Sequence, residues 1–376
     1  YLLLYFEENY GLTVEKKIID AVAVIANENR YHPVCDFLNA LQWDGTERIR
    51  FCLHRFLGSD TDDYTYEALK LFLLGAISRA FKPGCKFEVM LCLVGGQGAG
   101  KSSFFRLLAV NDDWFSDDLK KLDDENVYRK MQGHWIIEMS EMIATANAKS
   151  IEEIKSFLSR QKETYKIPYE THPADRKRQC VFGGSSNTLD FLPLDRTGNR
   201  RFVPVMVYPE RAEVHILADE QASREYINQM WAEAMEIYRS GNFRLRFSPA
   251  MNDYLKAHQK DFMPEDTKAG QILDYLERYS GSMVCSKQLY KEALGHDYDE
   301  PKQWELREIN DIMNNAVTGW RAFSNPRYFP EPYRRQKGWE RIRNDNEPDN
   351  SMDGFQEIPT EEMEQLGLPE EWLKQK

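Results

Sequence analysis

The 376-residue chain has no long hydrophobic run. Its longest candidate, Leu71–Ala80, is interrupted by Ser78 and Arg79 and is far shorter than the ~20 apolar residues that cross a bilayer. No basic leader precedes Tyr1, so we expect no signal peptide, and the absent initiator Met suggests a piece of a longer protein. These absences argue against a membrane protein.

Cysteine is also scarce. The six cysteines, at positions 35, 52, 85, 92, 180 and 285, form no CxxC pair and no cluster with histidine. This pattern predicts reduced, packed thiols of a cytoplasmic protein, and it disfavours a disulfide framework or a zinc site. The 42% hydrophobic content excludes wholesale disorder, and the length allows two or three packed units.

Positive charge is in deficit, with a net charge of −12. Much of this deficit belongs to the C-terminal segment, because residues 345–376 hold ten acids and two lysines, a net −8. The other 344 residues carry only −4, so a local nucleic-acid surface is not excluded. We expect this acidic segment, with its prolines and glycine, to be a mobile tail.

Hydrophobic patterning predicts an α/β fold with four units. Residues 1–60 are expected to be a helical region and 61–245 a P-loop core, which contains a strong helix over 62–81 with one apolar side. Short apolar runs at 89–94, 135–137, 179–182 and 202–207 predict buried parallel strands, with helices at 102–110 and 151–158 between them. We expect residues 246–343 to form a small domain with helices at 271–279, 287–294 and 302–314 and a terminal hairpin. Residues 344–376 are expected to be the tail.

The strongest motif is GGQGAGKS over Gly95–Ser102, a complete match to G-x-x-x-x-G-K-[ST] between a strand and a helix. Its glycines allow backbone N–H groups to surround a phosphate, Lys101 would reach the β/γ-phosphates, and Ser102 would bind Mg²⁺. We therefore predict an ATP and Mg²⁺ site formed by Gly95, Gly96, Gln97, Gly98, Ala99, Gly100, Lys101, Ser102 and Ser103.

Two further strand ends carry polar residues. Glu138 ends an apolar run and Glu141 follows three residues later, as expected for carboxylates that hold Mg²⁺ and orient water. Which of the two orients the water stays open. Asn187 ends the run that begins at Cys180, where it could bond the water or the γ-phosphate, although asparagine also suits a turn.

Basic residues gather at three places. Arg200 and Arg201 precede a strand and could supply an arginine finger across a subunit boundary, or form only surface ion pairs. Segment 160–178 predicts a hairpin that pairs 164–170 with 178–182 around the turn 171–175, with Lys162, Lys166, His172, Arg176 and Lys177 contacting DNA. A plain solvated turn is the alternative. The aromatic and basic segment 321–343 follows three helices, which indicates a winged-helix-like arrangement. In this arrangement the helix over 302–314 would be the recognition helix that contacts DNA.

Together these segments resemble the virulence-associated protein E (VapE/VirE) family of phages and mobile islands. The resemblance is carried by Tyr31–Val34, Trp43–Ile49, Pro83–Lys86, the P-loop, Trp135–Glu141, Phe157–Arg160, Tyr165–Tyr169, Arg178–Phe182 and Gly198–Arg201. It implies an ATPase core similar to AAA+ and superfamily-three helicases, with Lys101 and Ser102 as the P-loop pair. It also implies Glu138 and Glu141 as the acidic pair, Asn187 as the sensor, and Arg200 or Arg201 as the finger. The adjacent acid pair usual in AAA+ proteins is absent, because position 139 is Met.

The resulting hypothesis is a ring-forming DNA helicase or translocase, a hexamer being favoured, in the cytoplasm of a bacterial host. An ATP-switched DNA-binding initiator or regulator that does not unwind DNA is the alternative. A P-loop kinase for a small molecule is less compatible with the paired arginines and the basic hairpin.

Overall fold

The structure, a computed structural model, describes residues 1–119, 122, 127–140, 148–165, 174–194 and 199–342. The chain divides into two units, Tyr1–Glu265 and Asp266–Lys376. The expected boundaries at 60 and 245 are therefore not divisions of this structure, because residues on both sides of each pack together. Val34 and Ile49 share a core with the P-loop region, and Gln259 donates hydrogen bonds to the carbonyls of Asn199 and Phe202.

The first unit is built on a five-stranded parallel sheet in the order β2-β3-β6-β1-β7. Its strands are β1 (Met90–Val94), β2 (Phe115–Ser116), β3 (Ile136–Ser140), β6 (Val181–Ser186) and β7 (Phe202–Met206). The four strands predicted from apolar runs are confirmed, since both faces of the sheet are covered. The two-residue edge strand β2 was not predicted, because it is too short to show a pattern.

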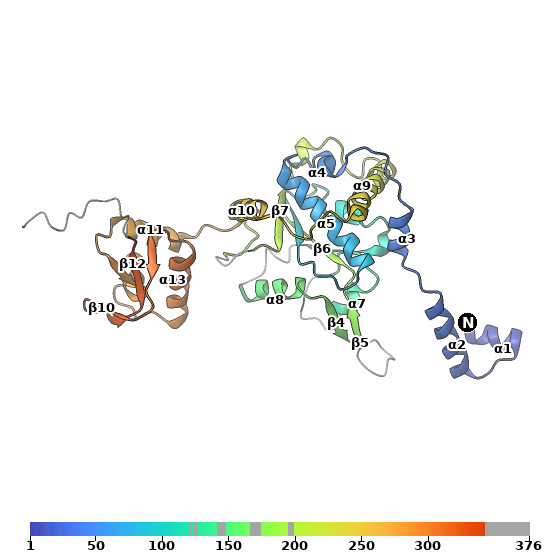
Figure 1. The fold of residues 1–376 in the computed structure, drawn as a ribbon, viewed down its shortest axis with the longest axis horizontal. Helices are drawn as coiled ribbons and strands as arrows, with labels where there is room; N and C mark the ends of the chain where they lie inside the picture. The colour runs from blue at the N-terminus through green and yellow to red at the C-terminus, as the bar shows by residue number, and fades with distance from the viewer. Residues whose placement is uncertain (120–121, 123–126, 141–147, 166–173, 195–198, 343–376) are drawn as a thin grey trace, which may run out of the picture. The chain divides into compact units, whose positions relative to one another are not determined.

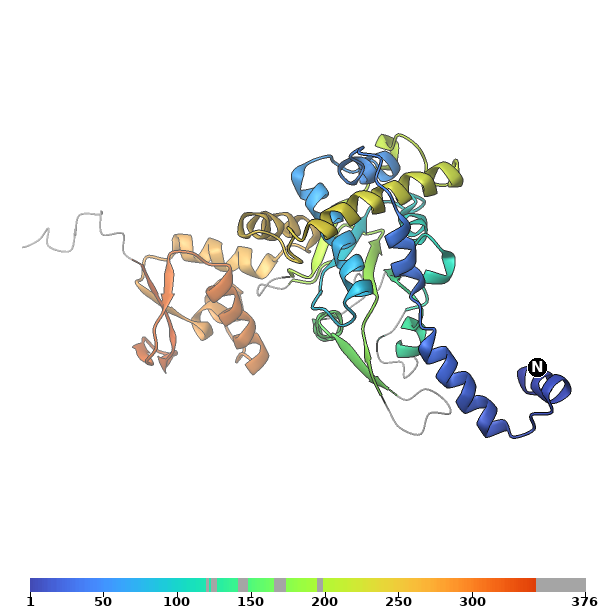
Figure 2. The same ribbon diagram turned by 45° about the vertical axis from the view of Figure 1, so that its right-hand side comes forward.

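Helices cover both faces of the sheet (Figures 1 and 2). Helices α5 (Asp63–Phe81) and α6 (Lys101–Leu108) pack on one face, and α7 (Val127–Met131) and α8 (Ala148–Leu158) pack on the other. This unit also contains α3 (Pro33–Ala40), α4 (Ile49–Leu57), α9 (Glu220–Ser240) and α10 (Pro249–His258). Helix α5 packs on the sheet and is covered in turn by α4 and α9. The prediction of one apolar side on α5 was therefore wrong, since this helix is buried on nearly all sides.

At the N-terminus, α1 (Leu2–Tyr10) buries no residue, and α2 (Glu15–Glu28) buries only Ile18. Within the described part of the chain, no helix is both long and apolar enough to cross a membrane.

The predicted hairpin exists, but with different strands. Strand β4 (Lys162–Tyr165) pairs antiparallel with β5 (Ala174–Lys177). The predicted partner segment, 178–182, instead leads into β6, whose two edges are occupied by β1 and β3. The hairpin was misassigned because a strand inside the sheet has no free edge for an antiparallel partner.

The second unit contains α11 (Thr267–Arg278), α12 (Ser286–Gln288), a π-helical turn (Leu289–Ala293) and α13 (Gln303–Asn315). Strands β8 (Met283–Cys285), β12 (Gly338–Arg341) and β9 (Trp320–Ala322) form a sheet in that order, and β10 (Arg327–Phe329) pairs with β11 (Arg334–Gln336) as a hairpin. Ile272, Leu289, Ile312 and Trp339 lie in its separate core. The three predicted helices and the hairpin are confirmed, whereas β8 was not predicted.

Candidate functional site

The glycine-rich segment forms a loop between the end of β1 and the start of α6. Gly98 and Gly100 have φ values of 80° and 81°, in the left-handed region that side chains rarely adopt. At Gly95, an added Cβ would lie 2.5 Å from the carbonyl oxygen of Val207. Glycine is thus required at these positions by backbone conformation or by close approach of another strand.

The first turn of α6 lies directly after this loop. The first hydrogen bond that closes the helix runs from the N–H of Phe104 to the carbonyl of Gly100. The N–H groups of Lys101, Ser102 and Ser103 precede it, and the first N–H groups of a helix have no partner within the helix. Together with the helix dipole they make this position suited to a phosphate.

Lys101 is nearly buried, and its ammonium group lies against the loop. The Nζ donates to the carbonyl oxygens of Gly95 and Gly96, at 2.7 and 2.8 Å. It also donates to Asn187 Oδ1 at 2.9 Å, which joins the loop to the end of β6. The predicted lysine and the predicted asparagine are therefore in direct contact, although 86 residues separate them.

Glu138 lies on β3 and is fully buried. Its Oε1 accepts hydrogen bonds from Ser102 Oγ at 2.7 Å and from Ser185 Oγ at 2.5 Å. Burial raises the pKa of this carboxyl, and the two hydroxyl donors oppose the shift. Its Oε2 is buried and has no hydrogen-bond partner among the residues that the structure describes.

An unpartnered carboxylate oxygen beside a serine hydroxyl is an arrangement that can accept a hard cation. Carboxylates and hydroxyls are oxygen ligands of the kind that Mg²⁺ takes, and a cation here would satisfy the Oε2 of Glu138. Ser102 and Glu138, the two residues predicted to hold metal, thus fit a divalent ion at this place. Glu141 lies outside the described residues.

Sheet order explains why these residues meet. The carboxyl ends of parallel strands lie at one edge of a sheet, and β6 lies between β1 and β3. Asn187 and Ser185 are therefore placed between the P-loop that follows β1 and Glu138 on β3. Ser185 was missed by sequence reasoning, and its only signal was its place among the small polar residues that end this strand.

Arg200 and Arg201 lie at the opposite edge of the sheet. The N–H of Met90, the first residue of β1, donates to the carbonyl of Arg201 at 2.7 Å. Because β1 is five residues long, this edge is about 17 Å from the P-loop at ~3.3 Å per residue. In this structure these arginines do not meet the P-loop of their own chain.

Both arginines contact Glu88. Arg200 is largely exposed and pairs with Glu88 Oε1 at 2.8 Å. Arg201 is less exposed, and its Nε lies 2.9 Å from Ser159 Oγ and 3.4 Å from Glu88 Oε2. The ion pairs weighed as the alternative to a finger are thus present within the chain.

The described basic residues of the hairpin divide between its two faces. Lys162 and Lys177 are cross-strand partners on one face, whereas Arg176 is opposite Glu163 on the other. Lys162 pairs with Asp175, and Arg176 lies over the ring of Tyr165. Lys166 and His172 lie outside the described residues.

The base of the hairpin is held by an ion pair that sequence reasoning missed. Arg178 and Glu163 are both buried and paired. Arg178 also donates to the carbonyl of Phe157 at 2.6 Å and lies over the Phe157 ring. The sequence shows these residues as part of a basic segment, and only their burial distinguishes them from solvated charges.

Comparison with known proteins gives one family and several similar structures. The family described as virulence-associated protein E-like domain matches residues 38–264. Three solved apo structures of the C-terminal region of NrS-1 are similar, with TM-scores of 0.47, 0.46 and 0.49. Their sequence identities are 12%, 14% and 14%, and each match covers 81% of this chain and 78% of the other. No curated protein matches the sequence.

Proposed function

Because the chain belongs to the virulence-associated protein E-like family, we propose that it is a Mg²⁺-dependent ATPase that acts on DNA in replication of a phage or mobile element. One observation carries the proposal. Three separate segments of the chain meet at this end of the sheet: Lys101 donates a hydrogen bond to Asn187, and Glu138 accepts one from Ser102 and one from Ser185.

In this proposal the loop N–H groups and Lys101 bind the β- and γ-phosphates of ATP. Mg²⁺ would be held by Ser102 and Glu138, and it would supply charge neutralisation on the phosphates. Lys101 would exchange its loop carbonyls for phosphate oxygens, which are stronger acceptors because they are charged. Asn187, released from that contact, is placed to bond the γ-phosphate or the attacking water.

We further propose that the site is completed by a second copy of the chain. The exposed Arg200, at the edge away from its own P-loop, is the better placed finger, and Arg201 would orient it through their shared partner Glu88. A finger at one edge and a P-loop at the other require a head-to-tail contact, which forms a ring where the rotation between neighbouring copies closes. This geometry supports a ring oligomer, with a hexamer as the favoured number.

DNA contact is assigned to two basic hairpins. On β4–β5, Lys177 lies directly opposite Lys162, which pairs with Asp175, so one face of the hairpin offers two lysines to a phosphate. The second unit has the element order of a winged helix, and Arg334 and Arg335 on its hairpin are exposed. Its helix α13 bears more acids than bases, so the hairpin is the better candidate for contact than the predicted reader helix.

The first test is ATP hydrolysis by the purified chain, with and without single-stranded DNA, beside a sizing measurement. Lys101→Ala should abolish nucleotide binding or turnover, whereas Lys256→Ala, an exposed lysine on α10, should leave both unchanged. Wild-type hydrolysis and affinity in Lys101→Ala would refute the site. Stimulation by DNA together with strand unwinding favours the helicase, and slow hydrolysis with DNA binding but no unwinding favours an ATP-switched initiator.

A further inference from the structure

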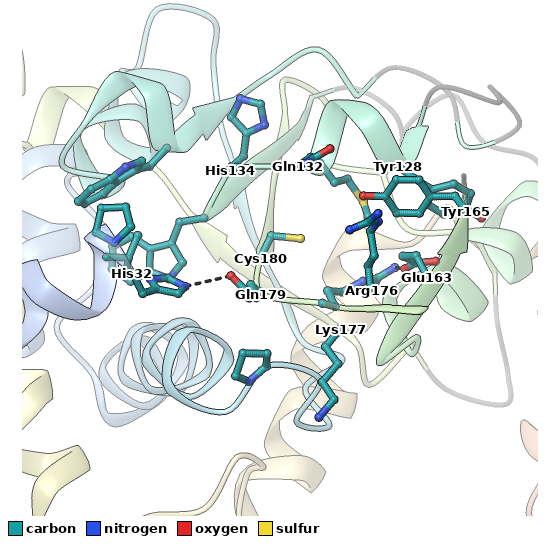
Figure 3. Close-up of a pocket in the computed structure, with 18 of the residues that line it drawn as sticks. His32, Tyr128, Gln132, His134, Glu163, Tyr165, Arg176, Lys177, Gln179 and Cys180 are labelled. Atoms are coloured by element: carbon teal, nitrogen blue, oxygen red, sulfur yellow. Dashed lines mark hydrogen bonds and ion pairs between the residues drawn. The ribbon is translucent and has the colours of Figure 1, made fainter. Parts of the chain in front are cut away.

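A cavity of about 800 Å³ lies away from the P-loop within the first unit (Figure 3). It is lined by residues that directly precede β3 and β6, including His134 and Gln179, and by the base of the β4–β5 hairpin. These are the amino ends of the strands, so the cavity is at the opposite edge of the sheet from Lys101. It takes no part in the proposed hydrolysis.

One wall of the cavity is aromatic. The rings of Tyr128, on α7, and Tyr165, on β4, are stacked with centroids 5.5 Å apart and planes at 16°. The Arg176 guanidinium lies 5.2 Å from the centroid of Tyr165. Arg160 fixes the first ring by donating to the hydroxyl of Tyr128 at 2.8 Å. Figure 3 shows Arg176 reaching toward this pair while Lys177 extends the other way.

The remaining lining offers groups that recognise the edge of a flat polar ligand. Gln179 Oε1 and His32 Nε2 are 2.9 Å apart on one side, and Gln132 and His134 lie on the other (Figure 3). The Nδ1 of His134 is buried, and no described residue forms a hydrogen bond with it. Amide and imidazole groups can both donate and accept, which suits the mixed pattern of a nucleobase.

The charge of the cavity favours an anion. Its two acids are neutralised, because Glu163 pairs with the buried Arg178 and Asp175 pairs with Lys162. Arg30 and Lys177 are exposed cations of the lining. A ligand with a flat aromatic part and a negative part matches this combination, whereas a purely apolar ligand would leave the polar lining unpaired.

We propose that this cavity binds one unstacked base of a single nucleic-acid strand against Tyr128 and Tyr165, with the adjoining phosphates at its cationic rim. The proposal rests on the proposed DNA-directed function and adds where a strand is held and how. Stacking on an aromatic surface is independent of base identity, so the site would accept any sequence. It also places the strand beside the hairpin residue Arg176, with Lys177 at the rim of the cavity.

The test separates stacking from phosphate contact by its response to salt. Binding of a labelled oligo(dT) with one central 2-aminopurine is measured by anisotropy across a salt series, with quenching of the base as a second readout. Tyr128→Leu should weaken binding by about fivefold or more at every salt concentration, because one stacked base is lost. The slope of log affinity against log salt should stay unchanged, since no phosphate contact is removed.

Two variants serve as controls. Tyr128→Phe keeps the ring and should retain both affinity and quenching. Tyr254→Leu makes the same chemical change at a partly exposed tyrosine on α10 and should change neither. If Tyr128→Leu does not fold, the exposed Arg30→Gln tests the same cavity, and it should reduce the salt slope by about 0.7.

The outcomes are distinguishable from those of the ATPase proposal. Wild-type affinity and quenching in Tyr128→Leu, or an unchanged slope in Arg30→Gln, would overturn the cavity proposal while ATP hydrolysis stood. Absence of oligonucleotide binding by the wild type would overturn it as well. If the wild type binds the oligonucleotide but does not hydrolyse ATP, the ATPase proposal is refuted and the binding result stays valid.

Discussion

The separation of the arginines from the P-loop makes a quantitative prediction about mixed oligomers. If Arg200 acts only on the neighbouring subunit, Arg200→Ala should lower ATP turnover by on the order of 10³-fold or more, as expected for loss of an arginine finger. Lys101→Ala should also be inactive. The Arg200→Ala subunit keeps an intact P-loop, and the Lys101→Ala subunit keeps an intact Arg200. In a mixed ring, an interface between these two subunits can therefore combine an intact P-loop with an intact arginine.

The expected recovery follows from counting interfaces. In a head-to-tail ring assembled at random from equal amounts of both variants, an intact P-loop meets an intact arginine at about one interface in four. Mixing should therefore restore up to about a quarter of wild-type turnover. The same experiment with Arg201→Ala shows which arginine is the finger.

The assay is steady-state phosphate release after co-refolding or subunit exchange, with native mass spectrometry to verify that mixed oligomers form. Two copies of the same variant, exchanged in the same way, are the control and should stay inactive. Two results would refute the hypothesis that an arginine at the opposite edge of the sheet completes the ATP site of the neighbouring subunit. One is no recovery of turnover in verified mixed rings, and the other is wild-type turnover by Arg200→Ala and by Arg201→Ala alone.

Three further predictions concern single side chains. Glu138→Gln should keep ATP bound but lower hydrolysis on the order of 10²–10⁴-fold, measured by nucleotide titration and single turnover; equal loss of binding would contradict it. Arg178→Met should destabilise the chain by about 3–5 kcal/mol, because it removes the buried partner of Glu163 and leaves only the longer contact with Arg160 at 3.6 Å. Urea unfolding measures this, with the more exposed Arg160→Met as control, and a loss below about 1 kcal/mol would contradict the pairing. Burial raises the pKa of Glu233, whose carboxylate caps the start of α4. The contribution of Glu233 to the free energy of unfolding should therefore be complete below about pH 4.3, the pKa of a free glutamate. It should be lost as the pH rises through the higher pKa of Glu233 in the folded state. Glu233→Gln should flatten this part of the stability profile, and an identical pH dependence in the variant would exclude Glu233 as its source.

The sequence alone was sufficient where a feature is local. The P-loop could be identified because its glycines are required by backbone conformation at Gly98 and Gly100, which is encoded within a few residues. The four apolar runs predicted the buried strands for a similar reason, since a strand covered on both faces needs apolar residues at consecutive positions. Asn187 was predicted from its place at the end of a strand, and Glu138 from the end of an apolar run, although Glu138 lies in the middle of β3.

Only the tertiary structure decided which of these residues meet and on which side. Strand order is set by packing between segments distant in the sequence, and it brings Ser185 to Glu138 and Asn187 to Lys101. The hairpin was assigned to the wrong strands because the sequence does not show that β6 already has two partners. Side-chain direction in a strand alternates with each residue, so the register also decided which cations share a face.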